Sequence, residues 1–233
     1  MTGKKDDQSI TQHIGMSEVG WLAGKVKLQP YNPKWAEMYK EVEAYIREVL
    51  SDYKDVQIHH VGSTAIPTIE KSKPMLDILI DVGEQDRDKI LTALRGKKLG
   101  EYGSTLEQER FIYSRMLGLC HDGGHQYMTH VMLDGIRTAN IHIPMHKCDS
   151  QKLLWFKQYL IEHSDVAQQY SKLKQRSALF NSRNLEKYGN KKEEFIIDIN
   201  KKADKLYCTP EIENEWFATK KLKENACQKL GIE

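Results

Sequence analysis

A turn and an acidic strand in the first third of the chain carry the residue types best suited to chemistry. Gly62 and Ser63 follow an alternating segment, and Asp77 lies farther along in an apolar run. A turn at this glycine offers backbone N–H groups and the hydroxyls of Ser63 and Thr64, which together can hold a phosphate group. An aspartate inside an apolar strand is costly unless a cation or a basic group compensates it. The pattern therefore predicts a phosphate site beside Asp77, whose carboxylate either holds a cation or is paired with a basic side chain.

The segments on either side of this turn have the periodicity of strands. Residues 56–61 alternate, whereas residues 75–82 are apolar except for Asp77 and Asp81. Short alternating or apolar runs bounded by turn residues are typical of strands. We expect the two strands to be adjacent, so that the Asp77 carboxylate lies near the turn. His60 comes just before the turn, and we expect it to orient the turn through a hydrogen bond.

The residues around this turn resemble the GrpB family of the nucleotidyltransferase superfamily. The similarity lies in residues 60–67 (HVGSTAIP), Lys73-Pro74, Asp77-Ile78, an early element at 31–35 and the segment 165–174. It covers about residues 27–207. The resemblance implies an α/β (α+β) fold with a nucleotidyltransferase-like mixed β-sheet, flanking helices and a helical C-terminal part.

This resemblance also implies an activity and a set of roles. The activity is transfer of a nucleotidyl group from ATP or another nucleoside triphosphate, with Mg²⁺, to a small-molecule acceptor, or activation of that acceptor. His142 is placed by the resemblance on the strand next to Asp77. The expected phosphate-binding residues are Gly62, Ser63, Thr64, Lys73 and Lys174. The expected catalytic residues are Asp77, Ser63 and His142, and Asp77 is also the expected metal ligand.

The sequence departs from the superfamily pattern at the second carboxylate. Relatives have a second acid two positions after the first, whereas this chain has Leu79 there. Asp81 shares the face of Asp77 but lies roughly 13 Å along the strand, too far for one ion to join both. A single carboxylate makes a weak Mg²⁺ site unless phosphate oxygens complete it. Two alternatives therefore stay open: a non-catalytic nucleotide-binding or interaction module, and an ATP-dependent ligase that acts through an adenylate.

The remaining pattern predicts an α/β core followed by helices. Helical spacing of apolar residues predicts helices near residues 35–50, 84–97, 149–162, 165–180 and 191–207. Further strands are expected at 26–28, 99–103, 110–116, 127–133 and 137–143, the last two joined by an Asp134-Gly135 hairpin turn. The expected division is a mobile tail (1–24), a nucleotidyltransferase-like core (25–147), a helical part packed on it (148–207) and a C-terminal helical extension (208–233).

Composition narrows the class of protein. The 233 residues carry 35 basic and 33 acidic side chains, a formal net charge of +2, which does not indicate a general nucleic-acid binder. Four cysteines without CxxC spacing make a disulfide framework or a structural zinc site unexpected. No apolar run approaches the roughly 20 residues of a membrane span, and the N-terminus lacks the apolar segment of a signal peptide. We expect a soluble cytoplasmic protein.

Overall fold

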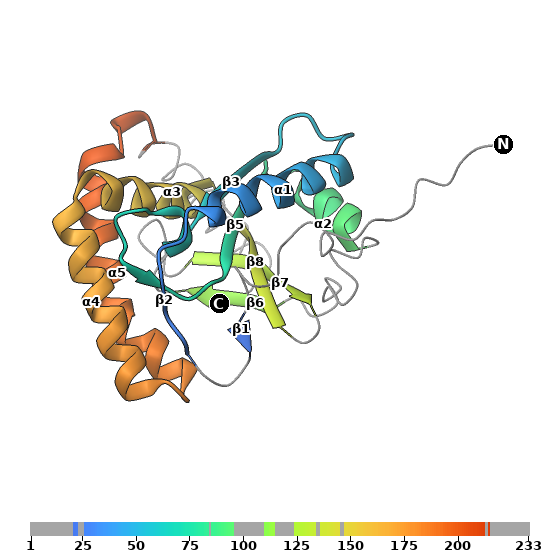
Figure 1. Cartoon of the computed structure of the whole chain (residues 1–233). Coiled ribbons are helices and arrows are strands. Elements are labelled where there is room, and N and C mark those ends of the chain that lie inside the picture. The colour runs from blue at the N-terminus through green and yellow to red at the C-terminus, as the bar shows by residue number, and fades with distance from the viewer. Residues whose placement is uncertain are drawn as a thin grey trace, which may run out of the picture.

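The computed structural model describes residues 21–22, 26–83, 85–95, 110–114, 124–133, 136–144, 147–212 and 214. Their elements are shown in Figure 1. In chain order they are β1 (Trp21–Leu22), β2 (Gln29–Pro30), α1 (Lys34–Val49), β3 (Gln57–Val61), the 3₁₀ turn η2 (Ser63–Ala65), β4 (Lys71–Ser72), β5 (Leu76–Asp81), α2 (Arg87–Arg95), β6 (Arg110–Ser114), β7 (Gly124–Leu133), β8 (Ile136–Pro144), α3 (Lys147–Glu162), α4 (Ser164–Asn181) and α5 (Leu185–Tyr207). This order confirms the predicted mixed α/β core followed by helices.

The main sheet is mixed and has the order β3-β5-β8-β7-β6, with β1 paired to β8. β3 and β5 are antiparallel, so Val61 lies opposite Asp77. β5 and β8 are parallel, and their register sets Asp77 beside Asn140 and Leu79 beside His142. The predicted position of the His142 strand next to the Asp77 strand is thereby confirmed. These two pairings bring the turn, Asp77 and His142 to one region of the sheet.

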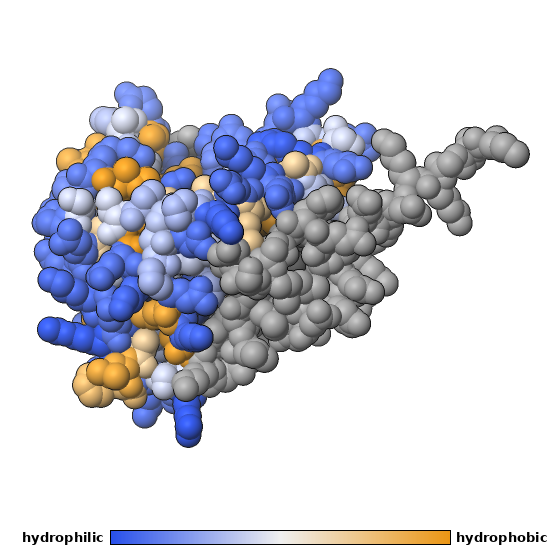
Figure 2. Space-filling model, in the orientation of Figure 1, coloured by the Kyte–Doolittle hydropathy of each residue, from blue (hydrophilic) through white to orange (hydrophobic). Residues whose placement is uncertain are grey.

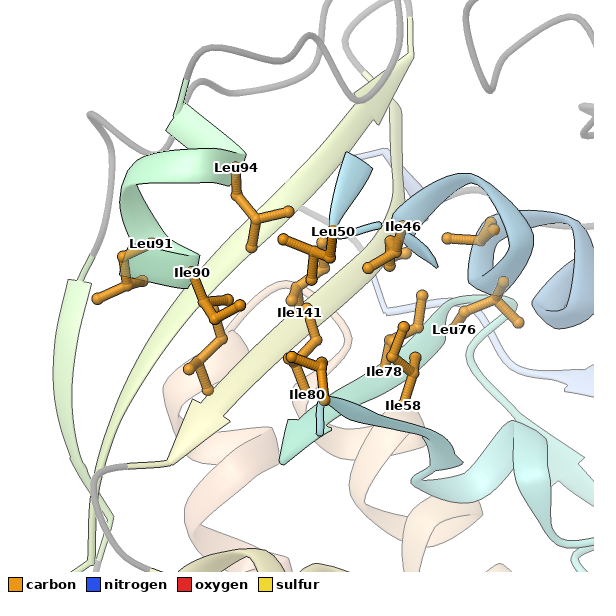
Figure 3. Packing of buried hydrophobic residues seen from close by; sticks show 14 of the residues in the cluster. Ile46, Leu50, Ile58, Leu76, Ile78, Ile80, Ile90, Leu91, Leu94 and Ile141 are labelled. Atoms are coloured by element: carbon orange, nitrogen blue, oxygen red, sulfur yellow. The ribbon is translucent and has the colours of Figure 1, made fainter. Parts of the chain in front are cut away.

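Alternation along β5 separates a core face from a face that carries polar groups. Ile78 and Ile80 are fully buried in a cluster with apolar side chains of α1, α2, β3 and β8. Figure 3 shows these side chains meeting between the two helices and the sheet. On the opposite face, the Asp81 carboxylate accepts a 2.8 Å hydrogen bond from the Ser150 hydroxyl of α3. Helices α1 and α2 therefore cover one face of β5, and α3 approaches the other.

Helices α3, α4 and α5 pack together beside the sheet, as Figure 1 shows. A second buried cluster joins them to the segment that follows the turn, because Ile66 and Ile69 are buried together with Leu160, Ala167 and Ile199. The surface in Figure 2 is mostly hydrophilic over the described residues on this face, with small apolar areas. The segment after the turn thus anchors the helical part to the core.

Three of the predicted helices match α3, α4 and α5, but α5 begins earlier than the apolar spacing predicts. It starts at Leu185, because the Asn184 side chain accepts a 2.9 Å hydrogen bond from the Lys187 backbone N–H and so caps the helix. The predicted helix already contains Lys192, and the early start adds Tyr188 one turn before it on the same face. Both residues become important in the site described below.

Other predictions differ from the structure or lie outside the described residues. Residues 26–28 are not a strand. The strand begins at Gln29, because residues 29–30 of β2 pair with β4. Residues 21–22 of the predicted tail form β1. The expected strand at 99–103, the 134–135 turn and the extension beyond residue 214 lie outside the described residues. Within the described part of the chain, no helix has both the length and the apolar character needed to span a membrane.

Candidate functional site

The turn at Gly62 lies directly against the Asp77 carboxylate. Gly62 has φ +69°, a conformation that other residues rarely adopt. A Cβ atom at this position would lie 2.2 Å from Asp77 Oδ2. Glycine is therefore required twice, once for the backbone conformation and once for the close approach. The expected position of Asp77 next to the turn is what the structure shows.

The Asp77 carboxylate is held by two side chains of β8. Asn140 Nδ2 donates a 2.7 Å hydrogen bond to Asp77 Oδ1, and His142 Nε2 lies 3.4 Å from the same oxygen. Burial by itself raises the pKa of Asp77. The hydrogen bond and charge of His142, the Asn140 amide and the Lys73 ammonium outweigh burial and bring this pKa below its ordinary value. Asp77 is therefore a carboxylate at neutral pH.

The residues on either side of the turn fasten it to the core. His60 Nε2 lies 3.0 Å from the Thr64 hydroxyl, which donates a 3.3 Å hydrogen bond to the Met75 carbonyl oxygen. Burial, with the nearby Lys157 ammonium, lowers the pKa of His60 to about 4, so this imidazole is neutral. The predicted hydrogen bond from His60 to the turn is thus present. The Thr64 side chain is buried and serves the turn rather than a ligand.

A cavity of about 310 Å³ opens between this turn and the helices α3, α4 and α5. Among the residues singled out from the sequence, those that line the cavity are Gly62, Ser63, Lys73, Asp77, His142 and Lys174. Thr64 is not among the lining residues. The fold therefore brings together residues of β3, β5, β8 and α4 that are far apart in the sequence.

Two helices present a tyrosine and a lysine to this cavity with the same spacing. Tyr170 and Lys174 lie four residues apart on α4, and Tyr188 and Lys192 lie four apart on α5, so each pair shares one face of its helix. The Lys174 Nζ atom is 5.1 Å from the centre of the Tyr170 ring. The Lys192 Nζ atom is 4.3 Å from the centre of the Tyr188 ring. The Lys174 ammonium also donates a 2.9 Å hydrogen bond to the Ser72 hydroxyl, and both lysines line the same cavity.

The lysines crowd the cavity with positive charge. Burial lowers the pKa of Lys174 well below its ordinary value, and the charges of Lys192 and Lys73 add to the effect. Burial, followed by the charge of Lys73, lowers the pKa of Lys192 to about 8. Among the described residues that line the cavity, Asp77 is the only carboxylate. An anionic ligand would relieve this imbalance.

A fourth lysine in the cavity wall already has an acidic partner. Lys152 on α3 is 1% exposed and donates a hydrogen bond to the Asp204 carboxylate of α5. A buried ammonium with a paired carboxylate adds little net charge. Lys152 therefore ties α3 to α5.

An aromatic surface continues from the turn toward α3. Ser63 of the turn and Tyr170 of α4 both line the cavity. The ring of Phe156 meets that of Tyr170 edge to face, with 5.6 Å between the ring centres. Burial raises the pKa of Tyr170, and the nearby Tyr188 and Asp77 raise it further, so Tyr170 keeps its proton. The helices therefore line the cavity with apolar and aromatic side chains as well as lysines.

Several residues of this site were missed in the sequence although signals for some of them exist. Asn140 shares a strand face with His142, two positions away. Tyr170 precedes Lys174 by one helical turn in the segment that resembles the GrpB family. Lys192 lies inside the predicted helix, but Tyr188 required the correct start of α5, and the position of Phe156 required the packing of α3.

The donor set does not form a magnesium site by itself. Within the described part of the chain, no group of three His, Cys, Asp or Glu side chains is arranged to hold a metal ion. Asp77 Oδ1 already accepts a hydrogen bond from Asn140. Mg²⁺ demands nearly octahedral oxygen coordination. Asp77 with a neighbouring imidazole and amide supplies few of the oxygen ligands that this coordination needs.

The chain is similar to several proteins of one family. Residues 25–202 match the family model described as GrpB protein. The chain is 29% identical over 179 residues to the UPF0157 protein YqkA of Bacillus subtilis, covering 77% of this chain and 47% of that relative. It is 25% identical over 187 residues to the Glutamate-rich protein GrpB of Alkalihalophilus pseudofirmus, covering 78% of this chain and 97% of the relative. The chain thus spans about half the length of the Bacillus subtilis relative.

A solved structure supports the fold. The crystal structure of the conserved protein GrpB from Enterococcus faecalis superposes with a TM-score of 0.58 at 24% sequence identity. The match covers 78% of this chain and 100% of that protein. At this identity the similarity establishes the architecture, and the chemistry has to be argued from the side chains.

Proposed function

Since the chain belongs to the GrpB family, we propose that its cavity binds a nucleoside triphosphate and transfers the nucleotidyl group to a small-molecule acceptor. One observation carries this proposal: Lys73, Lys174 and Lys192 converge beside the Gly62–Ser63 turn, in a cavity with a single carboxylate. A triphosphate is a compact polyanion that matches such a cluster. Lysines act on phosphate as point charges, and hydrogen bonds to charged groups contribute roughly 1.5–3 kcal/mol each.

The turn and the lysines have separate tasks in this proposal. Backbone N–H groups of the turn and the Ser63 hydroxyl hold one phosphate group. Lys174 and Lys192, directed inward from α4 and α5, take the charge of the phosphates that leave together as pyrophosphate. The empty cavity holds these ammonium groups at a cost, because burial and mutual repulsion lower their pKa. Binding of the polyanion removes that cost.

The transfer step requires a nucleophile, a base and a leaving group. The acceptor oxygen forms a bond to the α-phosphorus while the bond from that phosphorus to the bridging oxygen breaks, so that pyrophosphate leaves. His142, which lines the cavity, takes the proton of the acceptor hydroxyl, and Asp77 at 3.4 Å orients the imidazole. Mg²⁺ enters as part of the substrate, the Mg²⁺ complex of the triphosphate, whose oxygens supply the ligands that the protein lacks.

A second candidate is a nucleotide-binding module without catalysis. It is favoured by Leu79, which is fully buried where the superfamily has its second carboxylate. With one acid, the site lacks the means to hold two ions across the reacting phosphate. Both candidates share the triphosphate site and differ in whether a product forms.

Calorimetry tests the shared part of the proposal. ATP should bind to the wild-type protein with Mg²⁺ present, and Lys174→Met should weaken binding by about ten- to a hundredfold, the loss of one charge-assisted contact. Lys172→Met is the matched control, because Lys172 is exposed on the same helix. Equal affinities in the two variants would remove the lysine cluster from the proposal.

Mass spectrometry separates the two candidates. Wild-type protein, ATP and a pool of small metabolites should yield a product enlarged by one nucleotidyl group, together with pyrophosphate. His142→Gln should abolish the product and keep ATP binding. ATP binding without any product from a broad pool would favour the non-catalytic module.

A further inference from the structure

The cavity has a second feature that phosphate binding leaves unexplained. Besides the turn and the lysines, its lining includes the apolar side chains Leu153 and Phe156 of α3 and Ile196 of α5. A site for inorganic phosphate or polyphosphate has no use for an apolar wall. An apolar surface in contact with a charged pocket fits a ligand that carries phosphate on an organic group.

Tyr170 connects the two parts of this lining. Tyr170 and Ser63 of the turn both line the cavity. Burial raises the pKa of the Tyr170 hydroxyl, and Ser63 is near enough to lower it. The Tyr170 ring meets the Phe156 ring at 5.6 Å between centres and 84° between planes. On its other side the Tyr170 ring stacks on Phe195 at 5.3 Å, which fixes its orientation. The Tyr170 ring therefore lies between the turn and Phe156. A ligand held at Ser63 by its phosphate extends past Tyr170 toward Phe156.

We infer that Phe156 is the stacking residue for the nucleobase of the triphosphate, so that the wall of α3 and α5 selects an aromatic ligand. This inference rests on the function proposed above and names the part of the ligand that the helices recognise. Stacking on an aromatic side chain recognises every base by its flat face and is insensitive to its hydrogen-bonding edge. The wall therefore distinguishes nucleotides from polyphosphates and sugar phosphates, and discriminates weakly between bases.

Comparing a ligand that has a base with one that lacks it tests this inference separately from the proposed phosphate site. We would measure binding of ATP and of inorganic tripolyphosphate, each with Mg²⁺, to the wild type, Phe156→Leu and Phe156→Trp. The leucine keeps an apolar side chain and removes the flat ring, whereas tryptophan keeps a ring. Phe180→Leu is the matched control, because Phe180 on α4 is 80% exposed.

Phe156→Leu should weaken ATP binding by about tenfold, the loss of one stacking contact, and leave tripolyphosphate binding within about twofold. Phe156→Trp should restore ATP binding, and Phe180→Leu should change neither affinity. Equal weakening of both ligands by Phe156→Leu would show that the ring only supports the fold, and unchanged ATP binding would show that the base lies elsewhere; either result overturns the inference while the phosphate site stands. If the wild type binds neither ATP nor tripolyphosphate, the proposed function is overturned together with the inference.

Discussion

Lys192 offers the sharpest test of the view that this cavity is built for an anion. The ammonium sits in a wall with Lys73 and Lys174, and burial together with the Lys73 charge lowers its pKa from 10.5 to about 8. At about 1.4 kcal/mol for each pH unit, this corresponds to about 3 kcal/mol of destabilisation at neutral pH. The cation–π contact with Tyr188 at 4.3 Å offsets part of it, typically about 0.5–2 kcal/mol.

Lys192→Met removes the charge and keeps most of the side-chain length. We expect the variant to be more stable than wild type by about 1–3 kcal/mol at pH 7, because it loses the cost of the buried charge and also the contact with Tyr188. ATP binding should weaken by about ten- to a hundredfold, since one charge-assisted contact is lost. Urea unfolding and calorimetry measure the two effects, and Lys191→Met, at an exposed neighbouring position, is the matched control.

The pH dependence has a definite sign. The pKa of Lys192 is lower in the folded protein than in the unfolded chain, so the unfolded chain holds more protons between about pH 8 and 10.5. The destabilisation is therefore complete below about pH 8 and is relieved as the pH rises through that range. The stability advantage of Lys192→Met should shrink over the same interval. A variant that is less stable than wild type at pH 7, or that binds ATP unchanged, would refute the reasoning.

Three further results are expected. Gly62→Ala should lower the free energy of unfolding by about 2 kcal/mol or more, because of its positive φ and the contact with Asp77, whereas Gly189→Ala, whose Cβ meets no atom within 4 Å, should not destabilise the protein in urea unfolding. Asp77→Asn should fold with near-normal stability in a thermal melt and lose Mg²⁺-dependent ATP binding or turnover; a large loss of stability would instead assign the carboxylate a structural role. Calorimetric titration with Mg²⁺ alone should show no tight binding, and a tight site would mean that a protein ligand has been overlooked.

The core of the site could be predicted from the sequence because its signals are local. Alternation in residues 56–61 and the apolar run around Asp77 predict two strands, and the short segment between them keeps both near the turn. The position of the His142 strand came from the family resemblance, and the parallel pairing of β5 with β8 confirms it. The role of Asp77 as a cation ligand stays a prediction.

The helical side of the site could not be predicted in the same way. A lysine in a helix is normally exposed, so nothing local in the sequence indicates that Lys192 lines a cavity. Its contact with Tyr188 depends on the earlier start of α5, which Asn184 caps. Apolar spacing assigns Leu206 to the inner face of α5, but this residue is 60% exposed. The hydroxyl of Thr64 suggests phosphate in the sequence, yet its partner is a backbone carbonyl, which no side-chain pattern reveals.

The two walls of the cavity are contributed by stretches of chain that are synthesised at different times. The Lys174 ammonium donates a 2.9 Å hydrogen bond to the Ser72 hydroxyl across 102 positions of sequence, and the Lys71 backbone N–H bonds to Ser171 across 100 positions. While the ribosome is still adding α4 and α5, the emerging chain already contains the turn and Asp77 but no opposing lysines. A nascent chain therefore lacks this cavity, which forms only after the helices have left the ribosome and closed this long loop.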